Sequence, residues 1–147
     1  MKSMAKNYIK KLTISAPCED VFNAVATLKG LRGWWTSIVA GKDRSLGKLK
    51  LGFEGMDEHI IMDVVELEAW TRIKWQCEIH SSLEDWAGTE PIFSFHAKPK
   101  DRTELVFVHL GLVPSLECYG DCKLGWDHFL MSLKSYCETG KGHPFGH

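Results

Sequence analysis

The last third of the chain contains a long segment that repeats apolar side chains at the spacing of an α-helix. Lys123 to Glu138 reads KLGWDHFLMSLKSYCE. Its apolar side chains recur three or four residues apart, which places them along one helix face: Leu124, Trp126, Phe129, Leu130, Leu133 and Cys137. Polar residues, including Ser132, take the opposite face. Asp121 is suited to cap the start of this helix and Gly140 to end it. The preceding chain must therefore supply the surface that this apolar face covers.

Most of that preceding chain alternates apolar and polar residues with the period of β-strands. Tyr8 to Ser15 predicts a first strand, and PCEDVFNAVAT and LKGLRGWW then predict two short helices. Five further strands are predicted in LGKLKLGFEG, EHIIMDVVEL, AWTRIKWQCEIH, TEPIFSFHAKP and RTELVFVHLGL. Turns that contain Gly, Asp or Pro separate them at the spacing of hairpins, so we expect an antiparallel meander.

Each predicted strand has one apolar and one polar face. The residues expected on the apolar face are Ile60, Met62 and Val64; Ile73, Trp75, Cys77 and Ile79; Phe93, Phe95 and Ala97; and Leu105, Phe107 and His109. His59, His80 and His96 alternate to the other side, and we expect them at the surface. A sheet with a single apolar face needs a cover, and the final helix is the one predicted element long enough to provide it.

These elements predict an α+β fold in which a curved antiparallel sheet wraps around a long C-terminal helix. Such a sheet rarely fills its own interior, so a cavity between sheet and helix is the physical expectation. The sequence has no internal repeat or linker, and we expect residues 1–147 to form a single domain.

Several stretches of the sequence resemble a known family. They are Trp34-Trp35, VHLG at Val108 to Gly111, and GWDHFLMSLKSYCETGKGHP at Gly125 to Pro144. Together with the order of elements, they resemble the homologues of the activator of the heat-shock-protein ATPase, within the START-like and pollen-allergen-like helix-grip superfamily (SRPBCC). The resemblance extends from Ile9 to Pro144. It implies a helix-grip fold with a hydrophobic pocket. Because the superfamily includes carriers, cyclases, aromatases and partner-binding domains, function has to be argued from the site.

Composition narrows the classes of function. A formal net charge of -1 gives no basic surface for nucleic acid or for anionic membranes. The N-terminal residues lack the apolar core of a signal peptide, and no apolar run is long enough to span a bilayer. The five cysteines are an odd number without a pairing scheme, which favours free thiols and a cytoplasmic location.

The aromatic residues of the apolar faces are the candidate walls of a ligand-binding pocket, although ordinary core packing is the alternative. The candidate ligand-binding residues are Trp34, Trp35, Met62, Trp75, Cys77, Phe93, Phe95, Phe107, His109, Trp126, Phe129, Leu130 and Leu133. We expect the entrance to lie between Leu112–Lys123 and the Trp34–Gly47 segment.

His109 is the sharpest chemical candidate. An inward imidazole can hydrogen-bond a ligand or act as a general acid or base. The alternative is a core histidine whose ring nitrogens are satisfied by a backbone carbonyl or a tryptophan. No second inward ionisable residue is evident, and the usual catalytic motifs are absent, so no catalytic residue is assigned.

Two other groupings are weak candidates. Cys118 and Cys122, with His143 and His147 downstream, lack the spacing of a zinc site, and we interpret the cysteines as free loop thiols. Asp127 and His128 are neighbours on a helix and face different ways, so they do not predict a dyad. We therefore predict no metal and no cofactor.

The sequence thus favours a domain that binds a small, largely apolar molecule in an internal pocket. Two alternatives stay open: an enzyme of the cyclase, dehydratase or hydrolase type that uses His109, and a regulatory domain that binds a chaperone. The apolar positions are also compatible with a dimer interface, so both a monomer and a homodimer remain open.

Overall fold

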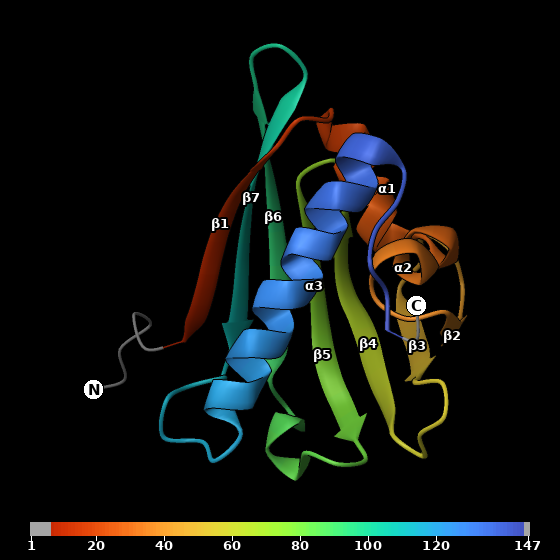
Figure 1. Ribbon diagram of the computed structural model, residues 1–147, viewed down its shortest axis with the longest axis vertical. Coiled ribbons are helices and arrows are strands. Elements are labelled where there is room, and N and C mark those ends of the chain that lie inside the picture. Colours follow the sequence, from red (N-terminus) through yellow and green to blue (C-terminus); the bar gives the residue numbers. More distant parts are fainter. Residues whose placement is uncertain (1–6, 146–147) are drawn as a thin grey trace.

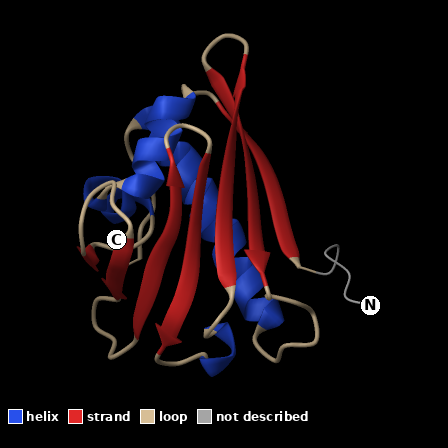
Figure 2. Ribbon diagram, turned by 180° about the vertical axis from the view of Figure 1, so that it is seen from behind, coloured by secondary structure: helices blue, strands red, loops and turns tan. Residues whose placement is uncertain are grey.

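The computed structural model describes residues 7–145, in which seven strands form one antiparallel sheet crossed by a long helix (Figure 1). The sheet order is β1-β7-β6-β5-β4-β3-β2. The strands are β1 (Tyr8–Ile14), β2 (Ile38–Ala40), β3 (Gly47–Gly52), β4 (His59–Glu68), β5 (Arg72–His80), β6 (Glu90–Lys98) and β7 (Arg102–Leu110). The helices are α1 (Cys18–Ala26), α2 (Leu28–Trp34) and α3 (Tyr119–Thr139), with a short 3-10 helix, η2 (Glu84–Trp86). Viewed from behind, the sheet lies in front of α3 (Figure 2). The predicted helix-grip fold is confirmed.

The long helix α3 starts earlier than the sequence predicted. It begins at Tyr119, so that Cys118 occupies the N-cap and Asp121 lies inside the first turn. At the other end Gly140 adopts the left-handed conformation that closes a helix, as expected.

The buried face of α3 also differs in part from the predicted face. Its buried residues are Cys122, Trp126, Leu130, Ser132 and Leu133. Leu124, predicted to face inward, is 66% exposed. It is two residues from both Cys122 and Trp126, and residues two apart on a helix point in nearly opposite directions. The prediction for Leu124 was wrong because the buried face starts at Cys122, a residue left out of the predicted helix.

The two short helices after β1 form where the sequence predicted them, and they cover one end of the sheet (Figure 1). Val21, Phe22 and Val25 of α1 are buried. The Trp34 indole donates a hydrogen bond to the Ala24 carbonyl at 2.8 Å, which holds α2 against α1. The edge strand β2 was not predicted, because three residues are too few for a two-residue period to be recognised.

The apolar face of the sheet is largely as predicted, with one break in β5. Ile61 of β4 pairs with Ile79, but Met62 pairs with Cys77, so Glu78 is an extra residue in the ladder. A bulge of this kind reverses the alternation beyond it. As a result Ile79 is 45% exposed and His80 is only 6% exposed, the reverse of both predictions.

The other departure on this face is Ala97. It is exposed because the tip of the β6–β7 hairpin extends past the helices that cover the sheet (Figure 1).

Polar contacts join α3 to the first strand. The Tyr8 hydroxyl donates a hydrogen bond to Asp127 at 2.5 Å. Burial, and then this carboxylate, raise the pKa of Tyr8. His128 instead has its ring Nε2 3.2 Å from the carbonyl oxygen of His143. Asp127 and His128 therefore serve separate contacts and form no dyad.

Candidate ligand-binding pocket

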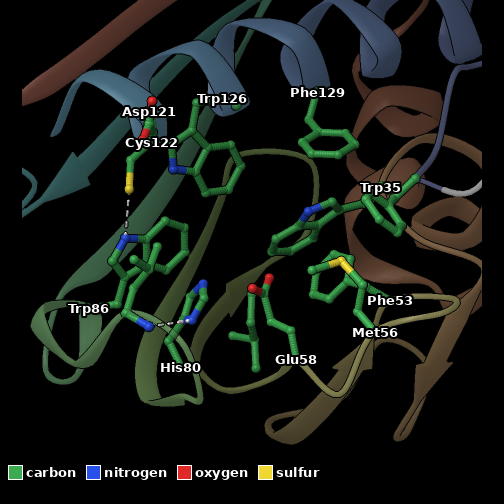
Figure 3. Close-up of a pocket in the computed structure, with 14 residues that line it drawn as sticks. Trp35, Phe53, Met56, Glu58, His80, Trp86, Asp121, Cys122, Trp126 and Phe129 are labelled. Carbon is green, nitrogen blue, oxygen red and sulfur yellow. Dashed lines mark hydrogen bonds between the residues drawn. The ribbon is translucent and has the colours of Figure 1, made fainter. Parts of the chain in front are cut away.

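A cavity of about 280 Å³ lies between the N-terminal half of α3 and the sheet (Figure 3). Ligand pockets commonly have volumes of roughly 300–1,000 Å³, so this cavity suits a small molecule. The residues that line it are Trp35, Phe53, Met56, Glu58, Ile60, His80, Leu83, Trp86, Asp121, Cys122, Gly125, Trp126, Phe129 and Phe145. They come from the C-cap of α2, from α3, from the β3–β4 turn and the start of β4, from the end of β5 and its following loop with η2, and from the C-terminal segment.

Stacked tryptophans form the walls of the cavity. Trp35 stacks on the buried Trp75 with ring centroids 5.5 Å apart, and its ring lies 5.4 Å from that of Trp126. Trp126 in turn stacks on Trp86 at 6.1 Å. Because each ring is held by at least one other, these walls are fixed in place before any ligand enters.

His109 supports this wall from behind. Trp126 donates its indole N–H to His109 Nδ1 at 2.9 Å. His109 Nε2 therefore carries the proton and donates to the Thr89 hydroxyl at 2.7 Å, which donates in turn to the carbonyl of Trp86. Burial lowers the pKa of His109 to about 3, so the ring is neutral. Both ring nitrogens are occupied, and His109 is not among the residues that line the cavity.

His80 reaches the cavity because of the bulge in β5. Its Nδ1 accepts hydrogen bonds from the backbone N–H groups of Ser82 and Leu83, at 3.2 and 3.0 Å. Burial lowers the pKa of His80, and the charge of Glu58 opposes this shift in part. The ring is thus neutral, with its remaining proton on Nε2.

The two cysteines at the start of α3 belong to the helix and its cap, and not to a loop as predicted. Cys122 Sγ accepts the indole N–H of Trp86 at 3.2 Å. Burial, reinforced by a hydrogen bond with Cys118, raises the pKa of Cys122 to about 12, so its thiol stays protonated. Within residues 7–145, no three His, Cys, Asp or Glu side chains are placed to hold a metal ion. His147 lies outside the described residues.

Carboxylates are the charged groups at the cavity. Glu58 and Asp121 line it, and neither carboxylate forms an ion pair or hydrogen bond with any residue that the structure describes. A neighbouring groove of about 620 Å³ shares Leu83 and Asp121 with the cavity. This groove adds the acidic residues Glu84, Asp85 and Glu117. No lysine or arginine lines either hollow.

The structure gathers three of the thirteen candidate binding residues at the cavity: Trp35, Trp126 and Phe129. The other ten lie elsewhere in the core, away from the cavity lining: Trp34, Met62, Trp75, Cys77, Phe93, Phe95, Phe107, His109, Leu130 and Leu133. They lie deeper because side chains fill most of the space between the sheet and α3, and the cavity occupies only one end of it. Contact of any of the thirteen with a ligand stays a prediction.

Sequence reasoning missed most of the lining residues. Of the predicted entrance, Leu112–Lys123 contributes Asp121 and Cys122, whereas the Trp34–Gly47 segment contributes Trp35 alone. The turn between β3 and β4 and the loop after β5 supply most of the rest. Trp86 carried a usable signal, since a tryptophan in a polar loop needs a burial site.

Comparison with known proteins identifies the family. The model of the Activator of Hsp90 ATPase homolog 1-like protein family matches residues 15–138. The chain belongs to this family. No curated protein matches the chain significantly. No helix in the described part of this family member is long and apolar enough to cross a membrane.

Solved structures share its fold. The Aha1 dimer from Colwellia psychrerythraea is 28% identical, with a TM-score of 0.79, covering 92% of this chain and 98% of that one. Protein SSP2350 from Staphylococcus saprophyticus is 20% identical, with a TM-score of 0.72 over 92% and 93% of the two chains. CalU16 from Micromonospora echinospora is 16% identical, with a TM-score of 0.65 over 87% and 71%.

Proposed function

We propose that this protein binds a small, largely apolar molecule in the cavity between α3 and the sheet. The observation that carries the proposal is an apolar hollow of about 280 Å³ with walls of stacked tryptophan. Burial of apolar ligand surface contributes roughly 25 cal/mol per Å², less the cost of ordering the ligand. The stacked walls reduce that cost, because they need no rearrangement.

No comparable observation favours the two alternatives. An enzyme that uses His109 needs a ring nitrogen that faces a substrate, and both nitrogens are bonded to Trp126 and Thr89. A chaperone partner is suggested by the name of the family, but no feature of residues 7–145 argues for it. The proposal is therefore for binding, without a reaction.

Mass spectrometry of the purified protein tests the proposal. A native spectrum should contain an additional small mass that is lost on denaturation, and its identification would give the ligand. The same spectrum measures whether the protein is a monomer or a dimer. If no mass is lost, titration with small aromatic compounds becomes the test, and failure of all of them to bind would contradict the proposal.

A substitution at Gly125 provides the matched control. Gly125 lines the cavity, and a Cβ added there meets no atom within 4 Å. Gly125→Leu should fill the hollow and lower ligand occupancy at least tenfold, while a helical Leu in place of Gly is favourable by roughly 1 kcal/mol. Gly120→Leu is the control, because Gly120 is also in α3 with open space beyond its Cα but lies outside the cavity lining. Equal occupancy in both variants would place the ligand elsewhere.

A further inference from the structure

Two N–H groups on buried side chains of the cavity lining have no acceptor among the residues that the structure describes. Trp35 Nε1 forms no hydrogen bond within the part of the chain that the structure describes, and neither does His80 Nε2. Both side chains are more than nine-tenths buried and line the cavity. Neither nitrogen is sealed in packed protein, so each reaches the open space of the hollow. Because each N–H opens into the cavity without a partner in the protein, these two groups are suited to an acceptor atom on a ligand.

The direction of the His80 proton is fixed by its surroundings. The backbone N–H groups of Ser82 and Leu83 both point at Nδ1, which leaves Nε2 as the donor. Figure 3 shows this free nitrogen turned into the cavity, toward the space beside Glu58. The bulge at Glu78 is what brings the ring inward, so the donor results from a specific irregularity of β5.

The carboxylate of Glu58 is turned toward the same space (Figure 3). Its charge acts on His80, yet the two side chains share no hydrogen bond or ion pair. The His80 N–H donor and the Glu58 carboxylate acceptor face the same space but do not bond to each other. A ligand group that both accepts and donates a hydrogen bond can bind both of them. A hydroxyl does so, because its oxygen can accept from His80 Nε2–H while its hydrogen is donated to Glu58. A bond to a carboxylate is the stronger kind, since it is assisted by charge.

We propose that His80 and Glu58 together recognise a hydroxyl group, so that the ligand is a small aromatic or apolar phenol or alcohol. This inference rests on the proposed function and names its ligand class. The charges around the cavity exclude the anionic alternative. Five carboxylates surround the two hollows, those of Glu58, Glu84, Asp85, Glu117 and Asp121, with no lysine or arginine among the lining residues. A carboxylate-bearing ligand would be repelled.

The test uses three probes with one ring system: 2-naphthol, 2-methoxynaphthalene and 2-naphthoate. Calorimetric titrations at neutral pH, where the naphthol hydroxyl is protonated, give the three dissociation constants. The methoxy probe keeps the acceptor oxygen but loses the hydrogen that Glu58 would accept. We expect 2-naphthol to bind at least about tenfold more tightly than 2-methoxynaphthalene, as the loss of one charge-assisted hydrogen bond implies. 2-Naphthoate should bind most weakly.

Two variants assign this preference to the proposed pair. Glu58→Ala should bring the naphthol-to-methoxynaphthalene ratio close to one, because it removes the acceptor that only naphthol can use. His80→Phe should instead weaken the binding of both probes, because both keep the oxygen that accepts from Nε2–H. Glu58 lies in a half-exposed turn, so its replacement tests the inference even if His80→Phe disturbs the loop that His80 anchors. Glu104→Ala is the control, because Glu104 is on the β7 face that alternates away from the buried Leu105. It should leave the ratio unchanged.

The outcomes separate this inference from the proposed function. Equal affinity for 2-naphthol and 2-methoxynaphthalene, a preference that survives Glu58→Ala, or unchanged affinities in His80→Phe overturns the hydroxyl assignment while the cavity still binds an apolar ring. Tightest binding of 2-naphthoate overturns it as well. Failure of all three probes overturns the hydroxyl assignment, and together with a native spectrum free of ligand mass it overturns the proposed function too.

Discussion

Two buried histidines have different roles because their ring nitrogens have different partners. His109 is bonded at both nitrogens and holds Trp126 and Thr89 in place. His80 is bonded at Nδ1 alone and keeps Nε2 for the cavity. Burial lowers the pKa of both. The sequence predicted a chemical role for His109 and a surface position for His80. Alternation predicts the direction of a side chain, but it does not predict how many hydrogen-bond partners the side chain has.

These lowered pKa values predict that acid destabilises the protein. In the folded state the pKa of His109 is about 3, whereas an unfolded histidine titrates near 6.5. The unfolded chain therefore binds protons first, and the free energy of unfolding should fall as the pH drops below about 6.5. His109 contributes up to about 1.4 kcal/mol per pH unit. His80 adds to the fall with the same sign.

Urea denaturation between pH 6.5 and 5, above the range in which most carboxylates titrate, measures this slope. In His109→Asn the amide oxygen can still accept from Trp126, but the titrating group is gone, so the slope should be smaller. An unchanged slope in this variant would contradict the assignment of the acid sensitivity to His109.

At the scale of an element, one extra residue in β5 decides which side chains reach the cavity. The bulge at Glu78 separates Ile73, Trp75 and Cys77, which follow the predicted alternation, from Ile79 and His80, which reverse it. Bulges are common beside functional sites because they re-aim a side chain. Here the reversal turns an isoleucine toward solvent and a histidine toward the candidate pocket.

Paired substitutions test the bulge. The predicted alternation makes Ile73 and Ile79 equivalent, but in the structure Ile73 is fully buried and Ile79 is 45% exposed. Ile73→Ala should lower the free energy of unfolding by about 2–5 kcal/mol, as expected for a buried isoleucine. Ile79→Ala should cost less than about 1 kcal/mol. Urea denaturation of both variants gives the comparison, and similar losses would show that β5 runs without the bulge.

At the scale of the whole molecule, the C-terminal segment closes the cavity by joining distant parts of the chain. Phe145 lines the cavity, and its backbone N–H donates to the carbonyl of Trp35 at 2.7 Å. Ser132 of α3 fixes the same segment. Its hydroxyl donates to the carbonyl of Trp34 at 2.8 Å and accepts the backbone N–H of His143 at 2.6 Å. This double contact explains why Ser132 is buried although the sequence placed it on the polar face.

Loss of the Ser132 hydroxyl should therefore destabilise the fold and loosen the segment. Ser132→Ala leaves two backbone groups without a partner at a site that is 1% exposed, which implies a loss of about 1–3 kcal/mol. Ser135→Ala is the control, because the Ser135 hydroxyl bonds the carbonyl of Lys141 at an exposed site and its loss should cost under about 0.5 kcal/mol. Chemical denaturation measures both losses. Equal losses would contradict the role of Ser132, and faster amide hydrogen exchange at Phe145 would support it.

The sequence by itself determined the three helices α1 to α3, six of the seven strands that the structure describes, and their order. The spacing of Trp126, Leu130 and Leu133 predicted α3, and the alternation in β4 and β7 predicted the sheet, because periodicity records which side of a regular element faces the core. The tertiary structure alone decided the pocket. Beyond Trp126 and Phe129 of α3, its lining depends largely on a bulge, a turn, a 3-10 helix and the C-terminal segment, which are too short or too irregular to show a sequence period. The location of the cavity depends on where the sheet and α3 fail to pack together, and only the assembled three-dimensional structure determines that.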